Sequence, residues 1–195
     1  HDLRRASAHA RSHLGYMAQR FSLYVDLTVY ENLKFFASAY GLDKKRRKHR
    51  LDWALQTFEL GDYQHTASGD LSLGYKQRLA MAASLLHEPD ILFLDEPTSG
   101  LDPNQIQEIR TLIKSIGKEK TVMLSTHIMQ EVEAMCDRVL IINKGTLVTD
   151  KKLKDLIAEG EQHIEVEFDL AVEEQLLRQL PHLDRAENLY DTTWT

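Results

Sequence analysis

The feature that most constrains the fold of this chain is a run of four apolar residues that ends in two adjacent carboxylates. Ile91–Leu94 is followed directly by Asp95 and Glu96. An uninterrupted apolar run is typical of a strand covered on both faces, as in a parallel sheet. Ligands of open parallel sheets bind outside the carboxyl ends of the strands, and two adjacent negative charges repel each other unless a cation lies nearby. The run therefore predicts a cation site at the end of a buried strand.

Helices and strands are predicted in alternation on both sides of this run. Thr28 and Glu31 have the spacing of a capping box, which predicts that a helix begins there. Apolar residues at helical spacing then predict helices at 29–40, 51–58, 75–88, 103–117 and 128–136. Strands are predicted at 14–18, 91–94, 121–125 and 139–142, and Asp150 is expected to cap a last short helix. The alternation predicts an α/β fold with a mostly parallel sheet, into which the helices at 28–60 are inserted as a helical subdomain.

The pattern changes beyond Gly160. Ile164, Val166 and Phe168 alternate with acidic residues, which predicts a half-buried strand, and residues 171–180 have helical spacing. One strand and one helix are too few for an independently stable domain. We therefore expect residues 161–195 to be the start of an accessory α+β domain.

The composition argues against some classes of protein. The net charge of −6 disfavours a nucleic-acid-binding protein, because such proteins normally carry a basic surface. Cys136 is the only cysteine, so no disulfide can form within these residues, and a reducing compartment fits. The basic run at 44–50 could indicate nucleic acid or anionic lipid as a partner. We interpret it as the solvated start of the second inserted helix, and no nucleic-acid partner is expected.

A second candidate site precedes the helix at 75–88. Ser72 and Gly74 stand just before that helix. The first N–H groups of a helix have no partner inside it, and the helix dipole favours an anion at this end. Alternatively, Ser72 is only the N-cap of the helix. Its place one helix before the Asp-Glu strand favours the anion site.

These segments together resemble the ATP-binding subunit of ABC transporters, over roughly residues 14–158. Five motifs in the family's order make the resemblance specific, although each alone would be weak. They are the signature motif at Ser72–Gln77, Walker B at Ile91–Glu96, the D-loop at Ser99–Asp102, the switch histidine at His127 and the Q-loop glutamine at Gln19.

The resemblance implies the fold of a P-loop NTPase, an ABC ATPase, with ATP and Mg²⁺ as ligands. Asp95 would bind Mg²⁺, Glu96 would orient or deprotonate the attacking water, and His127 would contact the γ-phosphate as a second catalytic residue. Gln19 would sense the Mg²⁺ and the water beside the bound ATP. The remaining ATP-binding residues would close on the nucleotide of a second subunit, paired head to tail; they are Ser72, Leu73, Gly74, Gln77 and Asp102.

The chain departs from the family pattern in three places. Leu73 stands where the signature motif usually has its first glycine, which we interpret as tuning more than loss. Ala18 stands where a proline is usual before the glutamine, which is a mild change. The printed residues hold no G-x-x-x-x-G-K-[ST], the phosphate loop of the family. We expect that loop and the N-terminal strands to lie upstream in a longer protein. Residues 1–158 would then be a partial ATPase domain, with a helical subdomain at about 25–88. Because the phosphate loop is absent, residues 1–195 alone would neither bind ATP tightly nor hydrolyse it.

The resemblance also implies a partner and a location. A transmembrane permease subunit would be the partner, and the protein would lie peripherally on the cytoplasmic face of the inner (cell) membrane. The stretches Y-M-x-Q-x-F-S-L-Y and S-x-G-Y-[KR]-Q-R most resemble exporters of the multidrug, antibiotic-resistance or gliding-motility kind. Phe21, Leu23 and Tyr24 would then either form a docking patch with the inserted helices or belong to the core. The alternative function is a soluble ABC-family ATPase that acts on ribosomes or DNA without a membrane partner.

Overall fold

The structure is a computed structural model in which the described residues are 7–159, 166–170, 172–177, 188–190 and 192–194. Contacts between residues divide the chain into two compact units, His1–Cys136 and Asp137–Thr195. All residues of the predicted site belong to the first unit. The domain boundary predicted between residues 158 and 161 stays a prediction.

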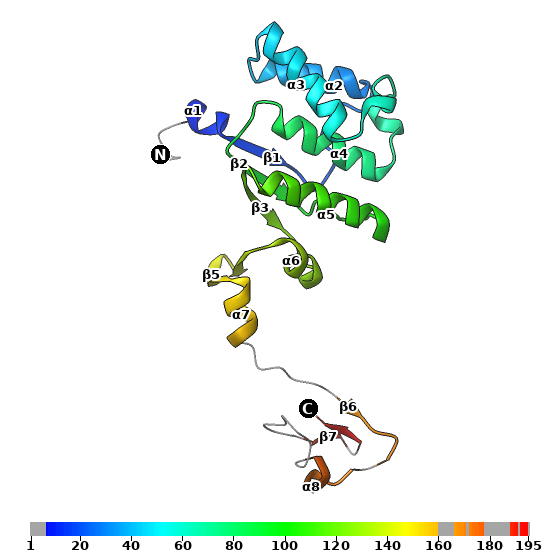
Figure 1. The fold of residues 1–195 in the computed structure, drawn as a ribbon, viewed down its shortest axis with the longest axis vertical. Coiled ribbons are helices and arrows are strands. Elements are labelled where there is room, and N and C mark those ends of the chain that lie inside the picture. Colours follow the sequence, from blue (N-terminus) through cyan, green and yellow to red (C-terminus); the bar gives the residue numbers. More distant parts are fainter. Residues whose placement is uncertain (1–6, 160–165, 171, 178–187, 191, 195) are drawn as a thin grey trace. The chain divides into compact units, whose positions relative to one another are not determined.

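A three-stranded parallel sheet organises the first unit (Figure 1). The register pairs Met17 with Leu94 and Asp95 with Ser125. The carboxyl ends of neighbouring strands therefore lie at the same edge, as the alternation in the sequence predicted. In spatial order, the strands are β1 (Leu14–Met17), β2 (Ile91–Asp95) and β3 (Thr121–Ser125).

One face of this sheet is buried and the other is more open. Met17 and Leu94, aligned on one face, are each 2% exposed. Tyr16, Phe93 and Met123 are aligned on the other face, and Tyr16 is 63% exposed. Successive side chains of a strand point to opposite faces, and only one face is well packed in the described part of the chain. The apolar run predicted cover on both faces of β2; on the more open face its residues Ile91 and Phe93 are partly buried, while Leu92 and Leu94 on the other face are fully buried.

The helix α4 (Leu73–Leu85) packs closely on the buried face. A Cβ added at Gly15 of β1 would lie 2.6 Å from the carbonyl oxygen of Ser84, so any larger residue would push α4 away from the sheet. Buried alanines such as Ala80 and Ala83 allow the same close approach from the side of the helix.

The first inserted helix begins at the cap that the sequence predicted. α2 (Val29–Ala39) starts with a capping box, in which the Thr28 side chain accepts a hydrogen bond from the Glu31 N–H at 3.2 Å. The Glu31 carboxylate accepts one in return from the Thr28 N–H at 2.9 Å. These hydrogen bonds to Thr28 hold the pKa of Glu31 below its usual value. Two free N–H groups at the helix start are thereby satisfied.

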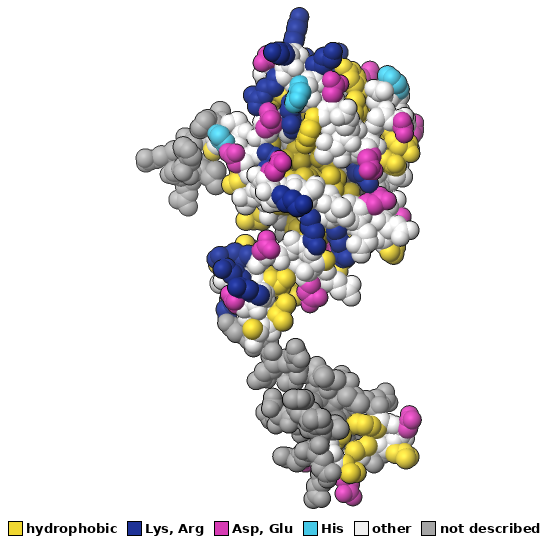
Figure 2. All heavy atoms as spheres, viewed as in Figure 1, with side chains coloured by type: hydrophobic (Ala, Val, Ile, Leu, Met, Phe, Trp, Pro, Cys, Tyr) yellow, Lys and Arg dark blue, Asp and Glu magenta, His cyan; other side chains and the backbone are white. Residues whose placement is uncertain are grey.

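The second inserted helix, α3 (Lys44–Thr57), includes the basic run before the apolar positions, as predicted. Asp43 is its N-cap and accepts hydrogen bonds from the N–H groups of Lys45 and Arg46, both at 2.9 Å. The basic run is therefore helical, and Figure 2 shows Lys and Arg side chains gathered over this part of the molecule. Most of them are exposed, which agrees with the predicted solvated helix start, but Arg50 is buried.

Arg50 joins α3 to the end of α4. Its Nη2 donates to the carbonyl oxygen of Leu85 at 2.8 Å, and its Nε donates to that of Leu86 at 3.1 Å. The last carbonyl groups of a helix have no partner inside it. Arg50 therefore satisfies the carbonyl of Leu86 at a buried helix end and adds a second donor to that of Leu85, which also accepts from the N–H of Glu88 at 3.1 Å.

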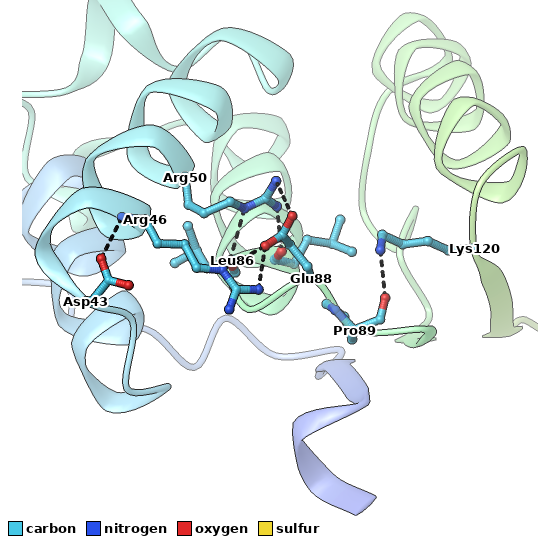
Figure 3. A network of polar contacts seen from close by, with 8 residues as sticks. Asp43, Arg46, Arg50, Leu86, Glu88, Pro89 and Lys120 are labelled. Atoms are coloured by element: carbon cyan, nitrogen blue, oxygen red, sulfur yellow. Dashed lines mark hydrogen bonds and ion pairs between the residues drawn. The ribbon is translucent and has the colours of Figure 1, made fainter. Parts of the chain in front are cut away.

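The turn from α4 into β2 is held from two sides (Figure 3). Glu88, with a positive φ of 59°, pairs with Arg46 of α3 at 2.6 Å. On the other side, the Nζ of Lys120, just before β3, donates to the carbonyl oxygen of Pro89 at 2.7 Å. These contacts fix the entry into β2, the strand that carries Asp95.

The rest of the first unit follows the predicted order. α5 (Pro103–Gly117) follows β2 and buries Ile109 and Ile113, one helical turn apart. The inserted helices, α4, α5 and the sheet contribute to one hydrophobic core. The smaller elements are α6 (Met129–Met135) after β3, α1 (Ser7–Ser12) and 3₁₀ turns at Gly61–Tyr63 and Ser68–Asp70.

The second unit departs from the predicted topology. β4 (Arg138–Asn143) was expected in the parallel sheet, but it pairs antiparallel with β5 (Thr146–Lys152) in a separate hairpin. Lys144 and Gly145 connect the two strands with φ values of 49° and 77°, as in the two-residue turns that join antiparallel strands. Such a turn cannot join parallel strands, so β4 takes β5 as its partner.

Asp150 is not a helix cap, and that prediction is wrong. It lies within β5 and accepts a hydrogen bond from the Nε of Arg138 at 2.6 Å, which lowers the pKa of Asp150. The strand predicted at 164–168 and the helix predicted at 171–180 lie only partly within the described residues. The elements found beyond β5 are α7 (Leu153–Glu159), α8 (Glu174–Leu177) and a sheet of order β6-β8-β7 formed by Val166–Glu167, Thr193–Trp194 and Asn188–Tyr190.

Candidate active site

Four predicted site residues follow the carboxyl ends of the three strands. Gln19 comes shortly after β1, Asp95 ends β2, Glu96 follows it, and His127 comes shortly after β3. The parallel register brings these positions to one edge of the sheet. Asp95, Glu96 and His127 form a connected cluster, which we call the strand-end group. Gln19 is exposed at the same edge.

Ser125 connects the ends of β2 and β3. Its Oγ donates a hydrogen bond to Oδ1 of Asp95 at 2.6 Å and accepts one from the N–H of Glu96 at 3.2 Å. Sequence reasoning missed this residue. The available signal was a hydroxyl at the last position of the strand, two residues before His127.

Glu96 has an unusual backbone. Its φ is +47°, in the left-handed region that residues with a side chain seldom adopt. Such a conformation costs about 1–3 kcal/mol and is found at functional sites more often than elsewhere. The chain thus turns sharply at Glu96 directly after β2, so Glu96 and Asp95 leave the strand in different directions.

The side chain of Glu96 pairs with His127. Glu96 Oε1 lies 2.8 Å from His127 Nδ1. The hydrogen bond and the charge of Glu96 raise the pKa of His127. The histidine ring is largely exposed, while the Glu96 side chain is 17% exposed. The pair therefore presents an imidazole with increased basicity at the edge of the sheet.

Ser72, Leu73 and Gly74 lie at the start of α4, and we call them the helix-start group. Ser72 is the N-cap by backbone conformation, but its side chain accepts no capping hydrogen bond from the helix. The exposed hydroxyl and the first N–H groups of α4 are thus available to an acceptor. This arrangement favours the anion site over the alternative that Ser72 serves only as a cap.

The helix-start group lies beside the segment that links β2 to α5. A Cβ at Gly74 would lie 3.1 Å from the side chain of Gln105, and a Cβ at Gly100 would lie 3.0 Å from the side chain of Leu73. Leu73, which replaces the usual glycine, therefore lies against Gly100. The φ of +76° at Gly100 also requires a glycine there.

Of the two remaining predicted residues, one caps a helix and the other is buried within one. Asp102 is the N-cap of α5, and its Oδ1 accepts hydrogen bonds from two backbone N–H groups in the first turn, both at 3.0 Å. Gln77 is 5% exposed within α4. The ion pair between Arg78 and Glu108, at 2.9 Å, links α4 to α5. The roles of Asp102 and Gln77 towards a nucleotide stay predictions.

The strand-end group has donors that suit Mg²⁺. This ion prefers carboxylate oxygens and usually keeps several waters or phosphate oxygens among its ligands. Asp95 uses Oδ1 for Ser125, which leaves Oδ2 for a cation or its water. Among the residues that the structure describes, no group of three or more His, Cys, Asp or Glu could hold a metal ion. The residues fit a cation that is shared with a phosphate ligand.

An aromatic groove of about 140 Å³ lies where β1 meets α2 and α4. Beside it, Tyr24, 51% exposed, packs edge-on against Phe35 with ring centres 4.8 Å apart, and its ring centre lies 6.4 Å from that of Phe36, which lines the groove. Phe21 and Leu23 are partly buried against the core. The residues that line the groove include Tyr16, Leu23, Phe36, Tyr40, Ala80 and Ala83.

Asn32, a second residue that sequence reasoning missed, holds the segment before α2. It is fully buried, and its amide both donates to the carbonyl oxygen of Tyr24 at 2.9 Å and accepts from the Tyr24 N–H at 3.0 Å. Ser68 Oγ donates to the same carbonyl at 2.8 Å. The available signal was a polar residue between the apolar positions of a predicted helix.

Comparisons with known proteins identify the family. The family model described as ABC transporter matches residues 1–99. The chain is 48% identical over 160 residues to the probable multidrug ABC transporter ATP-binding protein YbhF of Escherichia coli (strain K12), covering 82% of this chain and 28% of that protein. It is 38% identical over 135 residues to the ABC transporter ATP-binding protein NatA of Bacillus subtilis (strain 168), covering 69% and 55%. This chain belongs to the ATP-binding proteins of the ABC transporter family.

Solved structures agree with the predicted fold. CbiO1 from Clostridium perfringens, described as part of the ABC transporter complex cbiONQ, matches with a TM-score of 0.69 and 32% identity, over 76% of this chain and 61% of that one. An ATP-binding subunit of an ABC transporter matches with a TM-score of 0.69 and 29% identity, over 82% and 67%. The fold is that of an ABC ATPase. The chain spans 28% of the length of YbhF, so what the whole protein does is a matter of proposal.

Proposed function

We propose that the full-length protein hydrolyses ATP as the ATPase subunit of an ABC transporter, and that this transporter is an exporter. The observation that carries the proposal is the strand-end group. It combines two carboxylates, a histidine 2.8 Å from one of them and a strained backbone at Glu96. Family membership supports ATP as the substrate. Similarity to YbhF, named a probable multidrug transporter protein, supports export.

Each residue of the strand-end group has a chemical role in this proposal. Mg²⁺, when bound, supplies positive charge that compensates the phosphates of ATP, and Asp95 would hold it. Glu96 would orient a water or accept its proton. The pKa of His127 is raised, so a larger fraction of the imidazole carries a positive charge for the terminal phosphate near neutral pH. Gln19, at the same edge, would contact the water and the cation.

The helix-start group would act on the nucleotide of a second subunit. In the part of the chain that the structure describes, no hydrogen bond joins this group to the strand-end group. The free N–H groups at the start of α4 and the Ser72 hydroxyl can donate hydrogen bonds to a phosphate held by the other subunit. Asp102, at the start of α5, would lie at the same interface. A head-to-tail pair of subunits would thus complete two sites, each from both chains.

The aromatic groove supports a membrane partner. Exposed apolar patches usually mark partner sites, and a groove of this size suits side chains of a short amphipathic helix. We assign it to a cytoplasmic helix of a transmembrane permease subunit, which would place the protein peripherally on the cytoplasmic face of the cell membrane. None of the helices in the described part of the chain is itself long and apolar enough to cross a membrane. The alternative, an ATPase acting on ribosomes or DNA, needs no such groove.

The decisive experiment uses the full-length protein with Glu96→Gln. The variant should keep ATP binding but hydrolyse ATP about 10² to 10⁴ times more slowly, the usual contribution of a positioned base. It should also accumulate as an ATP-bound dimer in size-exclusion chromatography. Glu133→Gln, an exposed change on α6, is the matched control and should hydrolyse ATP like the wild type. Wild-type turnover in Glu96→Gln would contradict the role of Glu96 as base.

A further inference from the structure

Glu131 is a buried carboxylate that the proposed mechanism does not use. It lies on α6, and the residue is 1% exposed. Thr98 and Thr126 both donate side-chain hydrogen bonds to it, Thr98 to Oε1 and Thr126 to Oε2, the latter at 2.8 Å. A buried carboxylate is costly unless hydrogen bonds compensate it. Here each oxygen has its own hydroxyl donor, from a different part of the chain.

The two threonines belong to the two loops of the strand-end group. Thr98 stands two residues after Glu96 and is 2% exposed. Thr126 stands directly before His127, and its Oγ1 also accepts a hydrogen bond from the N–H of Ile128 at 3.2 Å. Glu131 therefore connects the loop after β2 to the loop after β3, from the buried side.

We propose that Glu131 is a positioning residue, which holds Glu96 and His127 at their 2.8 Å separation by binding both loops. The inference rests on the proposed ATPase function. The strained φ of +47° at Glu96 persists only if the surrounding structure imposes it. The hydrogen bonds of Ser125 fix the strand end itself, and those of Glu131 fix the chain on either side of the pair. Because an error of about 1 Å in a catalytic geometry can cost 10²-fold in rate, the loss of Glu131 should act on turnover.

The test measures ATP hydrolysis by the full-length protein. Glu131→Ala removes both hydrogen bonds and should lower kcat about 10- to 100-fold, with the KM for ATP within about twofold because Glu131 does not reach the nucleotide site. Glu131→Gln keeps the size of the side chain and one acceptor, and should recover most of the rate. Glu133→Ala, on the same helix but exposed, should leave both constants unchanged.

A double-mutant cycle separates positioning from simple packing. Thr98→Val removes one donor and should lower kcat by itself, but it should add little to Glu131→Ala, since both changes break the same connection. A folded Glu131→Ala protein with the kcat of the wild type would overturn the inference. If Glu131→Ala does not fold, Thr98→Val and Thr126→Val decide the question, and wild-type kcat in both would overturn it. Absence of hydrolysis in the wild-type protein would instead refute the proposed function.

Discussion

Arg50 is a charged residue in the core, and Arg50→Met should lower the free energy of unfolding by about 3 kcal/mol. The residue is 7% exposed, and it joins α3 to the carbonyl groups of Leu85 and Leu86. Methionine is chosen because it fills the volume of the arginine stem without the guanidinium. The substitution thus removes the polar contacts and keeps most of the packing.

The magnitude follows from the contacts that disappear. The Leu85 carbonyl oxygen keeps a hydrogen bond from the N–H of Glu88 at 3.1 Å, so the main loss falls on the carbonyl of Leu86. Leu86 is 0% exposed, so water cannot easily replace the lost donor, and an unsatisfied buried group costs about 1–3 kcal/mol. The guanidinium also lies 3.6 Å from the centre of the Trp53 ring, a contact worth about 0.5–1 kcal/mol. The ion pair with Glu88 is 3.7 Å long and its carboxylate is 43% exposed, so solvent screening limits it to about 0–1 kcal/mol. Burial desolvates the guanidinium charge, and this desolvation lowers the pKa of Arg50. The substitution removes the cost of this desolvation, which offsets part of the summed loss in stability.

Arg46→Met is the matched control for Arg50→Met. Arg46 lies one helical turn earlier, is 55% exposed and pairs with the same Glu88 at 2.6 Å. It contacts neither helix-end carbonyl, so its loss should cost less than about 1 kcal/mol. The assay is urea denaturation of the full-length protein, followed by circular dichroism, with the free energies extrapolated to water. Equal losses in the two variants would refute the reasoning, because they would assign the stabilisation to Glu88 and not to the carbonyl groups.

Two further predictions concern the groove and the histidine. Tyr24→Asp in the full-length protein should abolish co-sedimentation with the membrane fraction while basal ATPase activity persists, because the Tyr24 ring is exposed and packs against Phe35 and Phe36 of α2. Unchanged membrane association would count against docking. Because Glu96 raises the pKa of His127, the pair stabilises the fold fully below the unfolded pKa of about 6.5, and this contribution is lost as pH rises through the higher folded value. NMR titration of labelled histidine should show the His127 midpoint falling in Glu96→Gln, and an unmoved midpoint would show that Glu96 is not the cause.

Local features of the fold were predictable from the sequence. The capping box at Thr28, the N-cap at Asp102 and the apolar strand at Ile91–Leu94 involve residues a few positions apart, and the structure has all three. The motifs around Ser72 and His127 could be placed for the same reason, since each is read within one segment. The positions of the strand-end residues then followed from the parallel order of the strands.

Predictions failed where partners outside the local segment decide the outcome. Aspartate is a common helix cap, which is why Asp150 was predicted to be one. Its partner Arg138 lies on the neighbouring strand, and Asp150 stays in β5. The apolar run at Ile91–Leu94 cannot indicate how many faces of β2 are covered, because this depends on which helices pack there. Arg50 reads as part of a solvated basic run, although its partners at Leu85 and Leu86 lie 35 and 36 residues away.

The sequence by itself determined the family and most of the element order, and it supplied the residue types on which the proposed site chemistry rests, because these depend on patterns at short spacings. Only the tertiary structure decided how that site is held. Glu131 reaches Thr98 across 33 residues, and Asn32 reaches Ser68 across 36. A buried polar side chain must find partners wherever folding brings them, and no local pattern specifies which partners those are. The left-handed backbone at Glu96 has the same origin, since the contacts around it impose a conformation that a glutamate would not adopt alone.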